Sequence, residues 1–357
     1  MHQSLLIITP YQLGYHSDYY YWCKYLSKVY KIRYISFKTF EYCFEFNELD
    51  YDFVKPSTNP VIRILEYFIK GFSEIKKTKD ARIIVCQYKL NFLFKLVFPH
   101  KRILFDVRTG SVSKSLFIRF IVNLDLTICG ILYNHVSIID NGLRKKLHIP
   151  VTKCSIIPLG AESYSIKPKD YTKLSLFYIG TFSGRSIDKT LKGFKEFLKI
   201  YPDAVYHIVG YGHNKEENEL KMLVDELGLE RRVFIYGRKR HSEIQNLFEE
   251  CNVGISFVPI KPHYQHQPPT KLFEYLLSGM ICIATRTEAQ KKIINDDNGV
   301  LINDNASDFK WALVYIHNNR FSFHDDIIRC GAQQYQWETI ISDKLVPTIH
   351  RVFDKRL

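Results

Sequence analysis

The residues best suited to chemistry lie near position 270. Lys271 and Glu274 stand three positions apart in a segment predicted to form a short helix over 271–277, so they share one face of it. Two prolines stiffen the chain before it, and Thr270 is placed to cap the helix. A cation and a carboxylate at the start of a helix suit a ligand with phosphate and sugar hydroxyls. A Lys–Glu surface pair is the alternative interpretation.

Two glycine turns in the same half follow predicted strands. Gly180 leads to Arg185, which stands at the start of a predicted helix, where backbone amides and a guanidinium can share a diphosphate. Gly237 and Arg238 open another loop, where backbone groups can meet a flat base. The alternative at Gly180–Arg185 is an ordinary strand-to-helix turn with a solvated arginine, and at Gly237–Arg238 it is a capped helix after a turn.

These residues need elements to position them, and the chain alternates short β-rich runs with amphipathic segments. That pattern is typical of parallel sheets covered by helices. The strands predicted in the first half are 4–9, 32–37, 82–87, 102–107, 126–129, 136–139 and 155–158. Those predicted in the second half are 174–180, 205–210, 233–236, 253–257, 281–285 and 300–302. A polar linker over about 159–172 separates two doubly wound domains, and a last helix over about 334–353 could pack on either.

Length and charge agree with two unequal halves. The 357 residues exceed what one hydrophobic core usually supports, and 46% hydrophobic with 24% charged residues exclude a disordered, collagen-like or coiled-coil chain. Of the net charge of +13, residues 1–160 carry +11, from 23 Lys and Arg against 12 Asp and Glu. The first half is therefore expected to face nucleic acid, a phosphorylated substrate or an acidic membrane surface.

Basic, apolar and aromatic residues share three predicted helical segments of the first half, 61–79, 90–102 and 113–122. Such helices favour peripheral contact with anionic lipid, and core-facing helices with solvated lysines are the alternative. No nucleic-acid motif accompanies the charge, so nucleic acid is not an expected partner. Without a secretory signal or a membrane-spanning run, we expect a cytoplasmic protein, at most peripheral on the inner face of the cytoplasmic membrane.

Four segments, in this order and spacing, resemble the nucleotide-sugar-binding domain of glycosyltransferase family 4 (glycosyl transferases group 1), retaining enzymes of the GT-B fold. They are YIGTFSGRSIDKTLKGFKEF, HIVGYG, VFIYGRKRHSEIQNLFEECNVGISF and PPTKLFEYLLSGMICIAT, within about 156–302. The resemblance implies two Rossmann-like domains facing a central cleft. Residues 1–160 would bind the acceptor, residues 161–333 would bind the donor, and a C-terminal helix at 334–357 would pack back on the first domain.

The resemblance also implies roles for single residues. Glu274 matches the second glutamate of the family's E-x7-E motif, which holds the donor ribose, whereas the first glutamate is replaced by His266. Thr181 and Arg185 fall where the family has an Arg and a Lys for phosphate, so Lys271 would supply the second cation. The implied donor-binding set is Gly14, Gly180, Arg185, Gly237, Arg238, Thr270, Lys271, Leu272 and Glu274.

On the first half, Gly14 fits the family's glycine loop after the first strand. His16, Asp106 and Arg108 are the candidate acceptor contacts, and His16 joins Arg185 and Lys271 as a candidate catalytic residue. The alternatives are a helix-start histidine at His16 and an Asp–Arg pair that holds a loop at 106–108.

Metal signals are weak. Asp50 and Asp52 spell the D-x-D of metal-dependent glycosyltransferases but fall in a predicted polar loop, and His263 and His266 lack further ligands nearby. We expect no metal and no cofactor besides the nucleoside-diphosphate sugar that acts as donor.

The resemblance implies an enzyme that transfers a sugar from a nucleoside-diphosphate sugar to a saccharide acceptor with retention of anomeric configuration. The charge of the first half favours a lipid-linked acceptor, in bacterial-type surface polysaccharide or glycolipid synthesis. Two alternatives stay open: a sugar-nucleotide epimerase of the same fold, and a non-catalytic nucleotide-sugar-binding or scaffold protein, which would explain the missing first glutamate.

Overall fold

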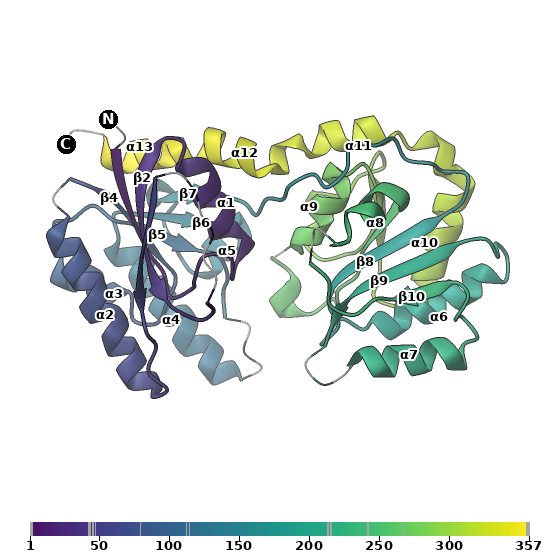
Figure 1. Cartoon of the computed structure of the whole chain (residues 1–357), viewed down its shortest axis with the longest axis horizontal. Coiled ribbons are helices and arrows are strands. Elements are labelled where there is room, and N and C mark those ends of the chain that lie inside the picture. Colours follow the sequence, from purple (N-terminus) through teal and green to yellow (C-terminus); the bar gives the residue numbers. More distant parts are fainter. Residues whose placement is uncertain are drawn as a thin grey trace. The chain divides into compact units, whose positions relative to one another are not determined.

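The computed structural model describes residues 3–41, 44, 46, 48–78, 80–111, 113, 115–212, 214, 216–240, 243–266 and 268–354. They form two compact units (Figure 1). Unit 1 combines Met1–Leu159 with Trp337–Leu357, and unit 2 is Gly160–Gln336.

Unit 1 is built on a sheet of seven parallel strands in the order β3-β2-β1-β4-β5-β6-β7. Its strands are β1 (Gln3–Ile8), β2 (Tyr30–Phe37), β3 (Leu49–Val54), β4 (Arg82–Cys86), β5 (Leu104–Val107), β6 (His135–Ile138) and β7 (Cys154–Ile156). Its α-helices are α1 (Ser17–Leu26), α2 (Pro60–Lys77), α3 (Phe92–Val97), α4 (Leu116–Leu132), α5 (Asn141–Lys146), α12 (Trp337–Ile340) and α13 (Val346–Phe353).

Unit 2 has a sheet of six parallel strands in the order β10-β9-β8-β11-β12-β13. Its strands are β8 (Ser175–Thr181), β9 (Val205–Tyr211), β10 (Val233–Ile235), β11 (Val253–Ser256), β12 (Ile281–Thr285) and β13 (Gly299–Ile302). Its α-helices are α6 (Ile187–Leu198), α7 (Glu216–Glu226), α8 (Gln245–Glu250), α9 (Thr270–Leu277), α10 (Ala306–Asn319) and α11 (Asp325–Ala332). The prediction of two Rossmann-like units is therefore confirmed.

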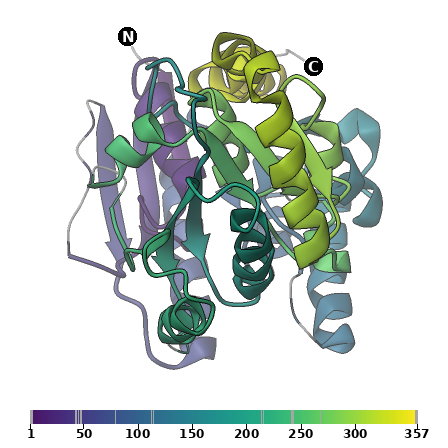
Figure 2. The same ribbon diagram turned by 90° about the vertical axis from the view of Figure 1, so that its right-hand side faces the viewer.

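Helices α6 and α10 run side by side over one face of the sheet of unit 2 (Figure 2). Gly193 of α6 lets them come this close, because a Cβ there would lie 2.5 Å from the carbonyl oxygen of Ala306. The opposite face carries α9, which packs on β11 and β12. The start of α9 is thereby fixed against the middle of the sheet.

Two predictions of secondary structure were wrong, both in unit 1. The strand expected at 126–129 lies inside α4, and the polar loop expected around residue 50 is the edge strand β3. In β3, charged residues alternate with aromatic ones, which suits an edge strand with one solvated face. In α4, apolar residues cover both the buried and the exposed side, so the helical period is hidden.

The C-terminal segment completes the core of unit 1. Trp337 is fully buried and stacks on Tyr21 of α1, with ring centroids 5.8 Å apart. A π-helical turn at Ile341–Leu345 joins α12 to α13 and precedes Pro347, which has no N–H to donate. The helix expected over 334–353 therefore begins only at Trp337 and contains a π-helical turn between its two α-helical parts.

His135, the first residue of β6, makes unit 1 sensitive to acid. Its Nε2 lies 2.8 Å from the hydroxyl of Ser155, and burial lowers its pKa to about 4, helped by the charge of Arg351. The unfolded chain takes up a proton below about pH 6.5, whereas folded His135 stays neutral down to about pH 4. Stability should therefore fall by up to about 3 kcal/mol as the pH drops through this window.

In urea unfolding of wild type and His135→Gln, the variant should lose less stability between pH 7 and pH 4. His148→Gln, a change at an exposed histidine, should behave like wild type. Equal acid sensitivity of His135→Gln and wild type would contradict this origin.

Candidate functional site

The carboxyl ends of β8 and β9 meet closely in unit 2. Gly210 makes this possible, because a Cβ there would lie 1.8 Å from the carbonyl oxygen of Gly180. Gly180 has φ +141°, and its own Cβ would lie 3.3 Å from Nζ of Lys271. The backbone at the end of β8 thus carries no side chain at Gly180, and it lies directly beside the amine of Lys271 in α9.

Lys271 lies in the first turn of α9 with only 8% of its surface exposed. Its Nζ is 3.5 Å from the centroid of the Tyr178 ring, and within the described part of the chain it has no hydrogen-bond partner. Burial lowers the pKa of Lys271 well below its usual value, the charge of Arg185 lowers it further, and Glu274 opposes both. A buried amine held only by an aromatic face is a preformed place for an anion.

Arg185 brings a second cation to this place. It precedes α6, and its guanidinium carbon lies 4.7 Å from the centroid of the Tyr264 ring. Its charge lowers the pKa of Lys271, so the two cations lie near each other. Lys189, a lysine in the first turn of α6, instead donates to the carbonyl of Asp304 at 2.7 Å.

The remaining predicted residues of α9 differ in their surroundings. Glu274 is half-buried, and its charge acts on Lys271. Leu272 is fully buried, so only its backbone is left to meet a ligand. Thr270 is not the cap: the N-cap position falls on Pro269, and no side chain caps the helix. The helix α9 therefore begins after Pro269 rather than at a capping threonine hydroxyl.

The loop before α9 carries His266 in place of a glutamate. Gln265 fixes this loop, because its carbonyl accepts from the amide of Ala289 at 2.7 Å and its side chain accepts from that of Glu288 at 3.0 Å. His266 is half-buried and close enough to Glu288 to act on its charge. The position is therefore held firmly against the loop that follows β12.

Gly237 and Arg238 lie beside the same strand ends. The carbonyl of Gly237 accepts from the amide of Gly210 at 2.9 Å, and Gly237 has φ +69° with open space where a Cβ would stand. Arg238 lies over Tyr211, 4.9 Å from the ring centroid. Unit 2 thus gathers the predicted residues from the ends of β8, β9 and β10 and from the start of α9 at one edge of its sheet.

In unit 1, Gly14 and His16 lie in the loop after β1. Gly14 has φ +92°, and a Cβ there would lie 2.1 Å from the ring of Phe44. His16 is exposed, with its ring edge-on to Tyr11 and Tyr15 at centroid distances of 4.4 and 4.9 Å. Although part of His16 is exposed, desolvation beside these rings lowers its pKa below the usual value.

Asp106 has no exposed surface. Its carboxylate accepts from the hydroxyl of Ser137 at 2.6 Å, from that of Tyr19 at 3.2 Å and from Nε of Arg108 at 2.8 Å. Both carboxylate oxygens of the buried Asp106 thus bind donors within the protein, so Asp106 is placed to hold Arg108.

Arg108 is held over Trp22, 4.4 Å from the ring centroid, and donates to the carbonyl of Ile157 at 3.1 Å. Burial alone would lower its pKa, but Asp106 and Asp18 raise the pKa above its usual value. Its Nη2 has no hydrogen-bond partner among the described residues. Neither Trp22 nor Ser137 was expected at this site, since nothing in their local sequence marks them.

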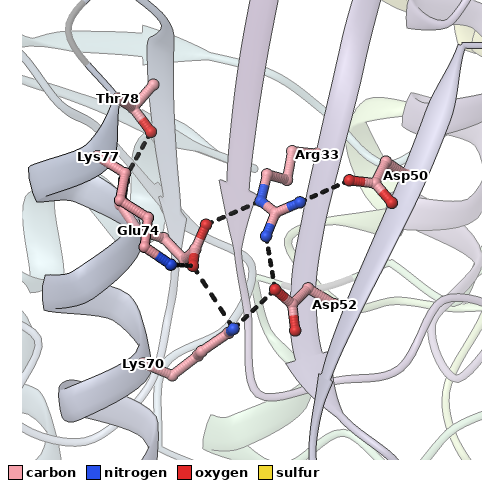
Figure 3. A network of polar contacts seen from close by, with 7 residues as sticks. All are labelled: Arg33, Asp50, Asp52, Lys70, Glu74, Lys77 and Thr78. Carbon is pink, nitrogen blue, oxygen red and sulfur yellow. Dashed lines mark hydrogen bonds and ion pairs between the residues drawn. The ribbon is translucent and has the colours of Figure 1, made fainter.

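The D-x-D carboxylates serve an ion-pair network in unit 1 (Figure 3). Arg33 donates to Asp50 and Asp52 at 2.6 Å each and to Glu74 at 2.8 Å, and Lys70 lies 2.6 Å from Asp52. Burial alone would raise the pKa of Glu74, but the hydrogen bonds from Lys77 and Arg33 bring it down to about 2. Both aspartates thus bind cationic side chains of the protein, which accounts for them structurally.

Comparison with known proteins agrees with this architecture. Residues 162–334 match the family model described as glycosyl transferases group 1. No curated protein matches the chain. Similar solved structures are a glycosyltransferase from Rickettsia africae ESF-5 (TM-score 0.75, 15% identity, 99% of this chain and 100% of that one), and sucrose-phosphate synthase from Thermosynechococcus elongatus (0.73, 15%, 98% of each).

A third similar structure is HepE from Anabaena in complex with UDP-glucose (0.72, 12% identity, 98% of this chain and 100% of that one). At such identities the likeness shows the fold, and these neighbours are GT-B glycosyltransferases. The predicted fold class is therefore confirmed, and the family match covers nearly all of unit 2. Residues 162–334 form a glycosyl transferases group 1 domain.

Proposed function

We propose that this protein transfers a sugar from a nucleoside-diphosphate sugar, bound on unit 2, to a saccharide acceptor. The observation that carries the proposal is Lys271, a buried amine over Tyr178 without a hydrogen-bond partner among the described residues. Leaving such a group unpaired costs stability, which a function in anion binding explains. The group 1 family match over the same residues supports this choice of anion.

Each residue at the edge of unit 2 takes one part of the donor in this proposal. Lys271 and Arg185 bind the diphosphate, and the bare backbone at Gly180 lets it approach. Glu274 binds ribose hydroxyls, one turn along α9 from Lys271. The backbone of Gly237 and Arg238 contacts the base, while the Arg238 side chain packs on Tyr211.

In the reaction, the bond from the anomeric carbon to the diphosphate breaks and a bond to the acceptor hydroxyl oxygen forms. Negative charge grows on the departing diphosphate, and the two cations stabilise it without a metal. The acceptor hydroxyl must lose its proton, for which neutral His16 on unit 1 is our candidate base. We include retention of configuration in the proposal and assign no covalent nucleophile.

For the acceptor we propose a lipid-linked saccharide, as in surface polysaccharide or glycolipid synthesis. The support is the charge of unit 1, since residues 1–160 carry +11 of the net charge of +13. Arg108 and His16 lie near the ends of β5 and β1, the edge of a parallel sheet at which ligands bind. Asp106 acts here by positioning Arg108.

A thermal-shift screen with nucleotide sugars tests the donor. One of the UDP-, GDP- or ADP-sugars should raise the melting temperature, because a ligand at 100 times its Kd stabilises the folded state by about 2.7 kcal/mol. CMP-sugars, with a single phosphate, serve as the matched control and should shift it less.

The same donor, incubated with and without saccharide acceptors, then separates the alternatives. Transfer should require an acceptor. Conversion of the donor to an epimer without acceptor would favour an epimerase, and no shift with any nucleotide sugar would contradict donor binding and favour a scaffold.

A further inference from the structure

The first turns of α4 expose large apolar side chains. Leu116, Phe117 and Phe120 are 74%, 71% and 65% exposed, and Ile121 and Leu124 are exposed as well. Single exposed apolar residues are common, but a cluster with two phenylalanines on one helix costs solubility unless a partner covers it. The buried residues of α4, which are Leu126, Cys129 and Gly130, lie in its second half, so the exposed first turns are not needed for the core of unit 1.

The exposed apolar surface continues over neighbouring helices. On α2, four residues of the first three turns are exposed: Val61, Ile62, Leu65 and Ile69. On α3, which packs against both α2 and α4, Leu96 and Val97 are exposed. We call these residues, with Leu116, Phe117, Ile118, Phe120, Ile121 and Leu124, the apolar face.

Basic residues are frequent in the same part of unit 1. Residues 60–132 contain 13 Lys and Arg against 5 Asp and Glu, and three of these basic and two of these acidic residues are buried. Arg119 lies within the exposed part of α4, and Lys76 and Lys77 are exposed at the end of α2. Lys145 and Lys146 are exposed on α5, whose C-terminal end packs on α4. A partner for this face must therefore be apolar within and anionic at its surface.

We propose that the apolar face docks unit 1 on an anionic lipid bilayer. Acyl chains accept the phenylalanines and leucines, and lipid phosphates neutralise the surrounding lysines and arginines. A second copy of this chain fits less well, because two faces of the same positive charge would repel each other. Among the described residues, no helix has the length and apolar character to traverse a bilayer.

Docking would place the sheet edge that carries His16 and Arg108 close to the lipid. In a parallel sheet, helices that follow strands begin at the carboxyl ends of those strands, and Figure 1 shows the first turns of α2 and α4 at the same edge of unit 1. A saccharide on a lipid carrier would then reach that edge. This consequence rests on the proposed function, whereas the docking itself does not.

Vesicle co-sedimentation tests the docking. Wild-type protein should sediment with phosphatidylcholine vesicles that contain phosphatidylglycerol, less with pure phosphatidylcholine, and less at high salt. Phe117→Ser with Phe120→Ser should weaken binding about 100-fold, since two phenylalanines no longer insert. Trp311→Ser with Phe321→Ser, two exposed aromatic residues of unit 2, is the matched control and should bind like wild type.

Two further measurements keep the outcomes apart. Both double variants should keep the melting temperature and the donor-induced shift of wild type, so lost vesicle binding cannot come from unfolding or from a damaged donor site. No binding of wild type to anionic vesicles, or equal binding of the Phe117/Phe120 variant, would overturn the proposal. A wild-type dimer that this variant dissociates, seen in sedimentation velocity without vesicle binding, would assign the face to self-association instead.

Discussion

Lys271→Met is expected to slow sugar transfer strongly and at the same time to stabilise the ligand-free protein. The amine is buried, rests on Tyr178 and lies beside the second cation Arg185, so its charge is costly before the donor arrives. Methionine keeps the length and the packing without the charge. We expect a loss of kcat/KM of about 10²–10³-fold and a gain of about 1 kcal/mol in the free energy of unfolding.

Initial rates of transfer, thermal unfolding and donor-induced shifts on the same preparation measure this prediction. The matched control is Lys192→Met on α6, which replaces an exposed lysine and should change neither the rate of transfer nor the stability. Transfer at the wild-type rate in Lys271→Met would contradict the proposal that Lys271 binds the donor diphosphate. Lost transfer together with lowered stability would mean that the amine is structural.

Asp106→Ala should unfold or nearly unfold unit 1. The carboxylate is fully buried and holds Arg108, Ser137 and Tyr19. Its removal leaves the guanidinium of Arg108 buried with Asp18 at 3.8 Å as the remaining carboxylate in the described cluster. Orphaning a buried charge in this way costs about 3–5 kcal/mol.

Urea unfolding measures this cost, and a second variant separates charge from packing. Asp106→Leu combined with Arg108→Met removes both charges and should recover a large part of the stability. A single Asp106→Ala variant as stable as wild type would show that Asp106 is not the residue that holds Arg108, and a direct role with acceptor would become the better account.

The sheets were predictable from sequence because their strands are buried on both faces. Such strands are short continuous apolar runs, as in residues 281–285, and this signal does not depend on distant residues. The same rule failed in α4, where a continuous apolar run is a helix with one side in the core and the other exposed. It also failed at β3, where Asp50 and Asp52 looked like a loop because their partners, Arg33 and Lys70, lie elsewhere in the sequence.

At the candidate site, the charged residues were predictable and their supports were not. Lys271, Arg185 and Glu274 stand beside helix starts and turns that local spacing reveals. Tyr178 lies 93 positions before Lys271, within the apolar and aromatic run LFYI of β8, so no local pattern marks it as the ring under the amine. The pairing follows from sheet order, which brings β8 next to β11 and under α9.

The return of the chain to unit 1 has a consequence for synthesis on the ribosome. Unit 2 is one continuous stretch and can close its core as soon as residue 336 has emerged. Unit 1 is translated first, yet Trp337, Leu345 and Ile349 belong to the same buried cluster as Trp22 and Tyr34. The nascent chain must therefore keep an unfinished first unit from aggregating while the second one folds.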